Sequence, residues 1–284
     1  MRRILVATLT AALWTPAVAA AQMTAPVVGN FGGGAVTTPP ASPFAAGSMV
    51  VGLRATGAAT IRVSATIVAR CASASFSATP AVAADGSFVA TGAVRQGNVR
   101  MSYELHGTLS ATPSGTATAS MRRTVGGRTR RCSARGVAWE VRRPFGGFGV
   151  PAAAAPGGLL LGITGQRQRG VRRGIALRVS PDGRALSRAI YGVTLRCTGD
   201  VRSVTFDLPR DDLAIAPDGR VSDRESTSRR TKATIVSSVE RFGATVGSDG
   251  AEGFLSATLT VRRRSTGRRI SRCRSGTVRW SASY

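Results

Sequence analysis

The sequence predicts an all-β protein built from two tandem antiparallel domains, each of sandwich or barrel-like form and each held by one disulfide. Three observations support this fold class. Apolar and polar residues alternate with period two along many short segments, which is typical of half-buried antiparallel strands. A series of landmarks occurs twice along the 284 residues, and each series contains two of the four cysteines. We find no run with a convincing helical period.

Residues 1–21 have the features of a secretory signal peptide. The positive start MRR precedes a short apolar run from Ile4 to Trp14, and residues 19–21 (AAA) fit a small-residue cleavage site. The apolar run is far shorter than the ~20 residues that a membrane-spanning helix needs. We therefore expect no transmembrane segment, and a mature protein that is secreted or associated with the cell envelope.

Two uncharged stretches rich in glycine, proline and alanine divide the rest of the chain. Residues 22–47 and 144–157 have the composition of linkers. They delimit two expected β domains, at residues 48–143 and 158–284. The glycine-rich run Phe31–Ala35 lies in the first linker and follows no expected strand, so we do not interpret it as a phosphate-binding loop.

The two domains match at five landmarks that come in the same order. We interpret this order as a tandem duplication, in which each copy ends on a strand with a tryptophan seven residues after its cysteine. The matched pairs are Met49–Leu53 with Leu159–Ile163, Ile61–Cys71 with Ile190–Cys197, Asp85-Gly86 with Asp218-Gly219, Gly115–Arg122 with Gly253–Arg262, and Cys132–Glu140 with Cys273–Ser281.

The strands expected within each copy come from the alternating runs. Ile61–Ile67, Val99–His106 and Leu255–Arg262 alternate most regularly, and each copy should contain about 6–8 strands. The second copy is longer before its first cysteine. The extra part contains the run Gly174–Ser180 followed by residues 181–183 (PDG), a hairpin signal, so we expect an added hairpin there.

Four cysteines in an exported chain indicate disulfides, and four cysteines allow three pairings. The repeat selects one of them, because each copy has one early cysteine and one in its last strand. We expect Cys71–Cys132 and Cys197–Cys273. Chain-entropy arguments limit the contribution of each bridge to roughly 4 kcal/mol.

The closing strand of each copy carries a tryptophan and a glycine with separate expected roles. We expect Trp139 and Trp280 to be core anchors that cover the disulfides. Gly136 and Gly276 interrupt the alternation before each tryptophan, which indicates a bend or bulge there.

An early cysteine, an Asp-Gly turn, a G-x-x-x-A strand and a closing C-x-x-G-x-V-x-W phrase together resemble a duplicated β-rich domain of uncharacterised exported proteins from high-GC actinobacteria. Cys273–Ser281 fits the closing phrase, whereas the glycine of Cys132–Glu140 lies one position later. The resemblance covers both domains. It implies a β-rich exported domain and implies no activity.

The charge is the strongest functional signal, since 39 basic residues oppose 14 acidic ones for a net charge of +25. Such a surface attracts polyanions. Lys232 is the single lysine, so the preference for arginine itself is typical of a GC-rich genome. We interpret the arginines of the hairpin before each closing cysteine as a polyanion-binding site, with solvated loops of biased composition as the alternative. They are Arg122, Arg123, Arg128, Arg130, Arg131, Arg262, Arg263, Arg264, Arg268, Arg269 and Arg272.

Catalytic and metal-binding patterns are weak. His106 is the single histidine, the second copy has no counterpart of it, and we interpret it as a surface residue. The cysteine spacings favour disulfides over zinc. The aspartates between Asp207 and Asp223 match no known calcium loop, and calcium there stays a minor alternative. We expect that the protein binds no metal or cofactor and is not an enzyme.

The sequence therefore favours an exported binding or structural protein that associates with anionic cell-envelope or extracellular polymers and contacts nucleic acid only non-specifically. The alternative is a module that binds another exported protein, with the charge as background. An exported hydrolase is a more distant alternative.

Overall fold

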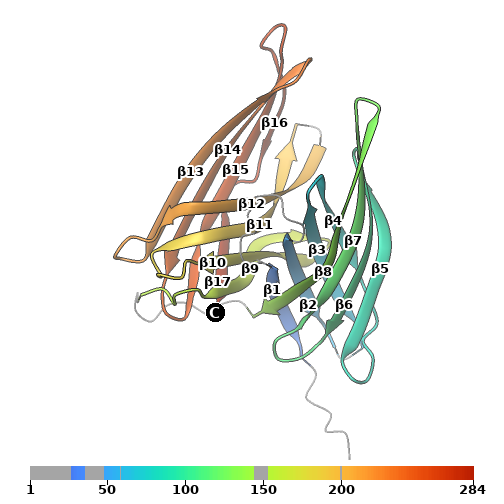
Figure 1. Ribbon diagram of the computed structural model, residues 1–284, viewed down its shortest axis with the longest axis vertical. Coiled ribbons are helices and arrows are strands. Elements are labelled where there is room, and N and C mark those ends of the chain that lie inside the picture. The colour runs from blue at the N-terminus through green and yellow to red at the C-terminus, as the bar shows by residue number, and fades with distance from the viewer. Residues whose placement is uncertain (1–26, 36–47, 58, 144–152, 199) are drawn as a thin grey trace, which may run out of the picture.

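A computed structural model describes residues 27–35, 48–57, 59–143, 153–198 and 200–284, with the backbone alone for residues 200–212. The chain is all-β, and the described residues contain no helix. Figure 1 shows two antiparallel sheets side by side, one from each half of the chain. The expected fold class is confirmed.

The first half forms an eight-stranded sheet in the order β4-β3-β2-β1-β8-β7-β6-β5. Neighbouring strands are antiparallel throughout. The strands are β1 (Gly29–Ala35), β2 (Ser48–Ala55), β3 (Ile61–Ala69), β4 (Ala72–Ala78), β5 (Ser87–Gln96), β6 (Val99–Thr108), β7 (Ser114–Val125) and β8 (Arg128–Arg142).

The second half repeats this order as β12-β11-β10-β9-β17-β15-β14-β13, with β16 pairing β11 and β15. Because β16 and β17 both pair with β15 and follow one another, together they take the place of β8. The shared strand order supports the tandem duplication. The strands are β9 (Leu159–Gln168), β10 (Val171–Val179), β11 (Ala185–Cys197), β12 (Asp200–Ala214), β13 (Arg220–Arg230), β14 (Thr234–Val246), β15 (Gly250–Arg263), β16 (Arg269–Arg274) and β17 (Val278–Ser283).

The first expected linker contains a strand, which corrects the expected domain boundary. Residues 29–35 form β1 between β2 and β8, and Phe31 is fully buried. The run has no alternation of polar and apolar residues because glycine occupies the positions where side chains would collide with neighbouring strands. Residues 1–26, 36–47 and 144–152, which include the expected signal peptide, lie outside the described part of the chain.

Because β1 was not expected from the sequence, one of the five matched pairs of landmarks is also wrong. By strand order β9 corresponds to β1 and β10 to β2, so Met49–Leu53 does not match Leu159–Ile163. The expected added hairpin is therefore wrong. The turn at Asp182-Gly183 joins β10 to β11 in the place where the first half joins β2 to β3.

Both expected disulfides are confirmed, Cys71–Cys132 and Cys197–Cys273. Trp139 and Trp280 are also confirmed as core residues, with 3% and 4% of their surface exposed. Neither tryptophan covers its disulfide. In the first half, Cys132 and Trp139 are seven residues apart on β8, about 23 Å by strand rise. In the second half, Cys273 on β16 and Trp280 on β17 lie opposite Leu259 and Gly253 of β15, which are about 20 Å apart by strand rise.

The tryptophans pack instead on other aromatic rings. Trp139 packs against Phe88, and Trp280 stacks on Phe242. The expected irregularity before each tryptophan is present. Gly136 has φ of 59° beside a register shift, and Gly276 has φ of 68° in the break between β16 and β17.

Each sheet curls until its ends approach. In the first half, the side-chain amide of Gln96 on β5 accepts a hydrogen bond from the Ser75 N–H on β4 (3.1 Å) and donates one to the Ser75 carbonyl (3.0 Å). Phe76 and Tyr103 stack across the same seam at 3.7 Å. In the second half, β16 pairs with β11, so strands β11, β10, β9, β17, β15 and β16 form a closed ring.

The two sheets contact each other through β1 and β2 of one half and β9 and β10 of the other. Glycine permits the approach: a Cβ on Gly52 would lie 1.8 Å from the Arg172 carbonyl oxygen, and one on Gly174 would lie 2.3 Å from the Val51 carbonyl oxygen. A small apolar cluster fills the rest of this interface. It consists of Val50, Leu161, Ala176 and Ile190.

Two buried arginines lie at or beside the interface. Arg188 donates a hydrogen bond across it to the Ser48 hydroxyl. Arg173, 3% exposed, donates to the Gln168 side-chain oxygen (2.8 Å) and the Thr194 hydroxyl (3.2 Å). Burial lowers the pKa of Arg173 to about 10, so its guanidinium still carries its charge at neutral pH.

Replacement of Gly52 by alanine should destabilise the protein, because the new methyl group meets the Arg172 carbonyl. We expect a loss of about 1–3 kcal/mol in the free energy of unfolding, measured by urea denaturation. Gly57→Ala is the control, since no heavy atom lies within 4 Å of its Cβ position. Equal unfolding midpoints for the two variants would contradict the glycine-mediated interface.

The Gln96 seam gives a second prediction. Gln96→Ala removes two hydrogen bonds to the Ser75 backbone and should cost about 1–3 kcal/mol of unfolding free energy. Native-state hydrogen exchange should show faster exchange of the Ser75 amide than in the parent. An unchanged exchange rate of the Ser75 amide would mean that other contacts hold β4 against β5.

Candidate anion-binding surface

The eleven predicted arginines lie on the hairpins β7–β8 and β15–β16, as expected, and in the first hairpin strand alternation divides them between two faces. Met121 and its neighbours at every second position point into the core, so Arg122 points outward and Arg123 points toward the disulfide end of the sheet interior. On β8, Arg131 likewise points outward, opposite Arg122.

The outward face of β5–β8 carries a row of four arginines in register. Arg95 lies directly opposite Arg100, Arg100 opposite Arg122, and Arg122 opposite Arg131. All four side chains are exposed. With strands about 4.8 Å apart, the row runs for about 14 Å across the sheet. We call it the arginine row.

Polar residues border the row along its length. On the side toward the hairpin tips, Asn98, Thr124 and Thr129 line with the arginines a hollow of about 590 Å³. The Asn98 side chain donates to the Thr124 carbonyl (2.9 Å), and the Thr124 and Thr129 hydroxyls are bonded to each other (3.1 Å). On the other side, Ser102 and Ser120 lie opposite one another. The border is thus uncharged and hydrogen-bonding.

Within the described residues, no carboxylate neutralises the row, and its four guanidinium groups take part in no hydrogen bond or ion pair. The nearest acid along β6 is Glu104, about 13 Å from Arg100 by strand rise. Glu104 itself is bonded to His106 at 2.6 Å. Like charges that lie directly opposite one another destabilise a sheet. The row is therefore unfavourable for the folded state on its own.

The strands of the second half that correspond to β5–β8 carry different residues at the positions of the arginine row. Arg131 and Arg272 each precede the last cysteine of their half by one residue, and the positions in register with Arg272 carry hydroxyl groups. Ser228 lies opposite Ser237, Ser237 opposite Thr260, and Thr260 opposite Arg272. Three of the four positions of the arginine row therefore have no basic counterpart in the second half.

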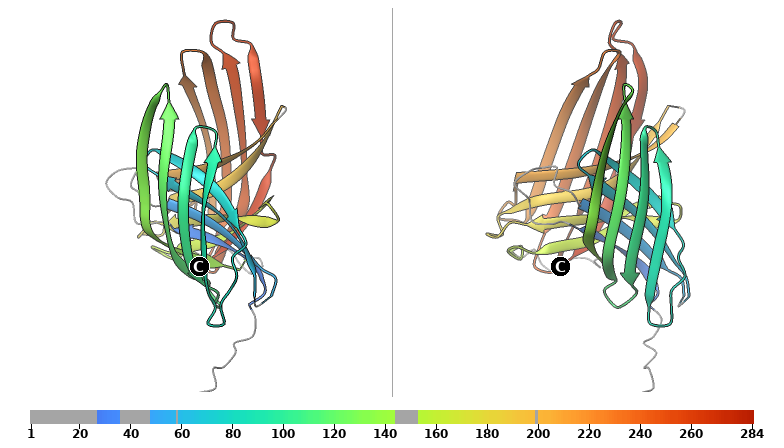
Figure 2. Two further views of the ribbon diagram at one scale, coloured as in Figure 1. Left: turned by 90° about the vertical axis from the view of Figure 1, so that its right-hand side faces the viewer. Right: turned by 45° about the vertical axis from the view of Figure 1, so that its right-hand side comes forward.

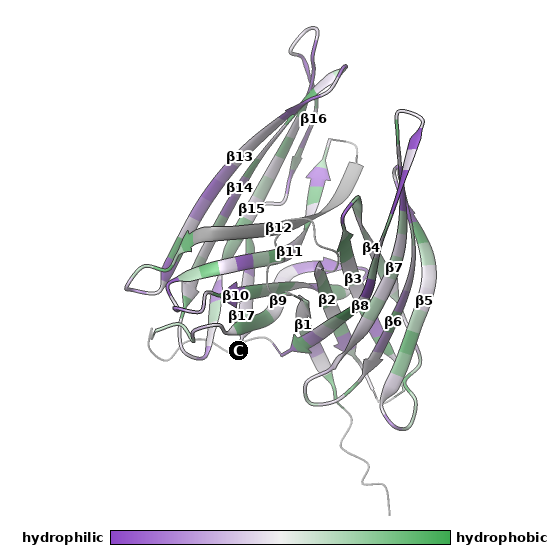
Figure 3. Cartoon of the chain, in the orientation of Figure 1, coloured by the Kyte–Doolittle hydropathy of each residue, from purple (hydrophilic) through white to green (hydrophobic). Residues whose placement is uncertain are grey.

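Four other predicted arginines of the second half lie at or near the turn between β15 and β16. Arg262 donates to the Gly267 carbonyl (3.1 Å) and Arg264 to the Thr231 carbonyl (3.4 Å), so both stabilise the extended hairpin end. Arg263 and Arg268 are exposed beside the same turn. Figure 3 shows hydrophilic colour near the end of the β7–β8 hairpin and along β13.

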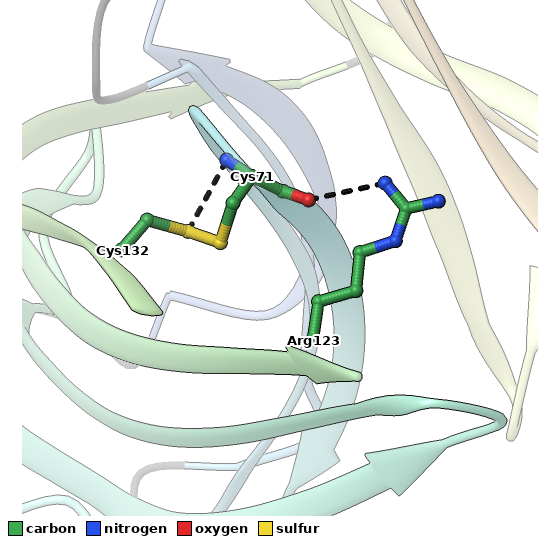
Figure 4. Close-up of a disulfide and its surroundings, with 3 residues drawn as sticks. All are labelled: Cys71, Arg123 and Cys132. Carbon is green, nitrogen blue, oxygen red and sulfur yellow. Dashed lines mark hydrogen bonds between the residues drawn. A yellow bond between two sulfur atoms is a disulfide. The ribbon is translucent and has the colours of Figure 1, made fainter. Parts of the chain in front are cut away.

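Two further hollows lined by arginine lie beside the disulfides. In the second half, Arg269 and Arg272 line a hollow of about 960 Å³ next to Cys197, together with Arg167, Arg196 and Arg274. In the first half, Arg123, Arg128 and Arg130 line a smaller hollow next to Cys71. Figure 4 shows Arg123 beside the Cys71–Cys132 bridge, donating to the Cys71 carbonyl at 3.2 Å.

Sequence reasoning missed Arg95 and Arg100, which form half of the row. The signal in the sequence is the pair Gly97-Asn98 between two strand-like runs, which is typical of a two-residue hairpin turn. In the structure Gly97 has φ of 58°. A two-residue turn at Gly97-Asn98 places Arg95 opposite Arg100, and the Gly126-Gly127 turn places Arg122 opposite Arg131.

The remaining candidates for chemistry are not assembled into a site. His106 is about half exposed on the outer face of β6 and contacts Glu104. In the described residues, no three His, Cys, Asp or Glu side chains come together as a metal site. Asp218 belongs to a turn and pairs with Arg220 at 3.5 Å. The side chains of Asp207, Asp211 and Asp212 lie outside the described part.

No protein family, curated protein or solved structure matches this chain. Among the described residues there is no helix with the length and apolar character needed to cross a membrane.

Replacement of Arg100 by glutamine should make the folded protein more stable, because Arg100 has an arginine opposite it on both sides. We expect a gain of a few tenths to about 1 kcal/mol at low salt, measured by urea denaturation. The gain should shrink as salt screens the repulsion. Loss of stability at low salt would contradict a repulsive row.

Proposed function

We propose that this protein binds an anionic polymer of the cell envelope through the outer face of β5–β8, with the arginine row as the principal contact. The observation that carries the proposal is the row itself: four guanidinium groups in register, without an acidic partner among the described residues. Opposed arginines destabilise the folded state, and an anionic ligand that binds between them would offset this cost.

The geometry favours a linear ligand that crosses the strands. The four arginines occupy directly opposite positions on neighbouring strands, so their backbones form a row about 14 Å long across the sheet. Each guanidinium offers a planar pair of donors that suits phosphate or carboxylate groups. The threonines, serines and Asn98 beside the row offer hydrogen bonds to uncharged parts of a polymer such as sugar or polyol hydroxyls.

Two general properties support an envelope location. Both disulfides require an oxidising compartment to form and persist. The net charge of +25 attracts polyanions over the whole surface and so raises the rate of encounter with the row. Within this proposal the protein is a binding protein and not an enzyme.

The experiment compares two variants that lose the same charge. The row variant carries R95Q, R100Q, R122Q and R131Q. The control variant replaces four exposed arginines outside β5–β8, Arg62, Arg224, Arg241 and Arg279, by glutamine. Binding of both to teichoic-acid-type and polyuronate polymers is measured across a salt series, with single-stranded DNA as a further polyanion.

We expect the row variant to lose most of its affinity and the control variant to keep most of it. Each polymer contact contributes about 0.7–0.9 to the slope of log affinity against log salt, so the row variant should lose a slope of about 3. If both variants lose affinity equally, the net charge and not the row causes binding. If the parent binds none of these polymers, or binds with little dependence on salt, the proposal is wrong and a protein partner becomes the better hypothesis.

A further inference from the structure

Five arginines from both halves of the chain surround one small hollow at the disulfide end of the first sheet. Arg70 comes from the two-residue turn between β3 and β4, and Arg229 comes from the end of β13 in the second half. Arg123, Arg128 and Arg130 come from the β7–β8 hairpin. The hollow has a volume of about 290 Å³, and none of the described residues that line it is acidic.

The hollow is separate from the arginine row, although the two share strands. Arg123 and Arg130 lie opposite each other, one residue along from the pair Arg122 and Arg131. Because successive side chains of a strand point to opposite faces, the two pairs point away from each other. A ligand in the hollow therefore leaves the row free.

Two features fix part of the hollow before any ligand arrives. The Cys71–Cys132 bridge holds the β3–β4 turn against β8, and Arg123 is oriented by its bond to the Cys71 carbonyl (3.2 Å; Figure 4). Figures 1 and 2 show the ends of the β7–β8 and β13–β14 hairpins at the same end of the molecule in every view. The second half therefore presents Arg229 to a site that the first half builds.

We propose that this hollow binds a small phosphate-type anion with two or more negative charges, and that the anion links the two halves. Five guanidinium groups around a hollow of this size need several negative charges, which one carboxylate does not supply. The volume is at the lower limit of ordinary small-molecule sites, about 300–1,000 Å³, and fits a di- or triphosphate group. Arginine binds such groups through paired, charge-assisted hydrogen bonds.

The test uses inorganic pyrophosphate as the probe, with titration calorimetry on the full mature chain at fixed ionic strength. The parent should bind one pyrophosphate in the hollow with saturation. Arg229→Gln should weaken binding about tenfold or more, since a hydrogen bond to a charged group contributes about 1.5–3 kcal/mol, and every 1.4 kcal/mol corresponds to a tenfold change in affinity. Arg230→Gln is the matched control, because Arg230 is the exposed neighbour of Arg229 and does not line the hollow.

The outcomes separate this site from the polymer site. The row variant should keep its affinity for pyrophosphate, and Arg229→Gln should keep its affinity for the polymer. The phosphate groups could belong to a free small anion or to the end of a longer chain. A short polyphosphate chain tests the second source and should compete with pyrophosphate for the hollow. Absence of saturable binding by the parent, or equal losses in the R229Q and R230Q variants, would overturn the proposal in favour of general attraction to positive charge. Unfolding midpoints of both variants, measured without the probe, show whether any loss reflects misfolding.

Discussion

The close approach of two glycine-bearing sheet faces determines the arrangement of the whole molecule. Where β1 and β2 lie on β9 and β10, backbone atoms of the two halves come nearer than any side chain allows, as the positions of Gly52 and Gly174 show. The contact involves one part of each sheet, and the remaining strands extend beyond it (Figure 2). The hairpins that bear the arginines therefore lie away from the interface, and β13 of one half comes near β7 and β8 of the other.

Charge and stability oppose each other at the far end of the first sheet. The core packing of Met101 and Met121 and the disulfide at Cys132 hold the strands that carry Arg100, Arg122 and Arg131 in fixed register. A flexible loop would let those side chains separate, whereas a paired sheet keeps their backbones about 4.8 Å apart. The corresponding positions of the second half avoid this repulsion. There Ser228 and Ser237 occupy the places of two of the arginines, and their hydroxyls are hydrogen-bonded to each other at 3.4 Å.

The sequence was sufficient for features that depend on neighbours along the chain or on the repeat. Period-two alternation predicted the strands, and the repeat predicted both disulfides and the buried positions of Trp139 and Trp280. β1 was missed because Gly29–Ala35 is specified by what packs against it and not by its own alternation. The arginine row was half missed because it depends on the register of four strands. Arg229 was not connected with Arg123 because the docking of the two halves, which brings them together, has no local signal.

The edge position of β13 has a consequence for how copies of this chain meet. β13 is the last strand of its sheet, and an uncovered edge offers backbone groups to any passing strand. Its sequence, RVSDRESTSRR, carries arginine and acidic side chains along that edge, which a second copy would have to bury or neutralise in order to pair with it. The same residues that make the surface basic thus act against sheet extension from chain to chain. At high protein concentration this favours dispersed molecules over aggregates.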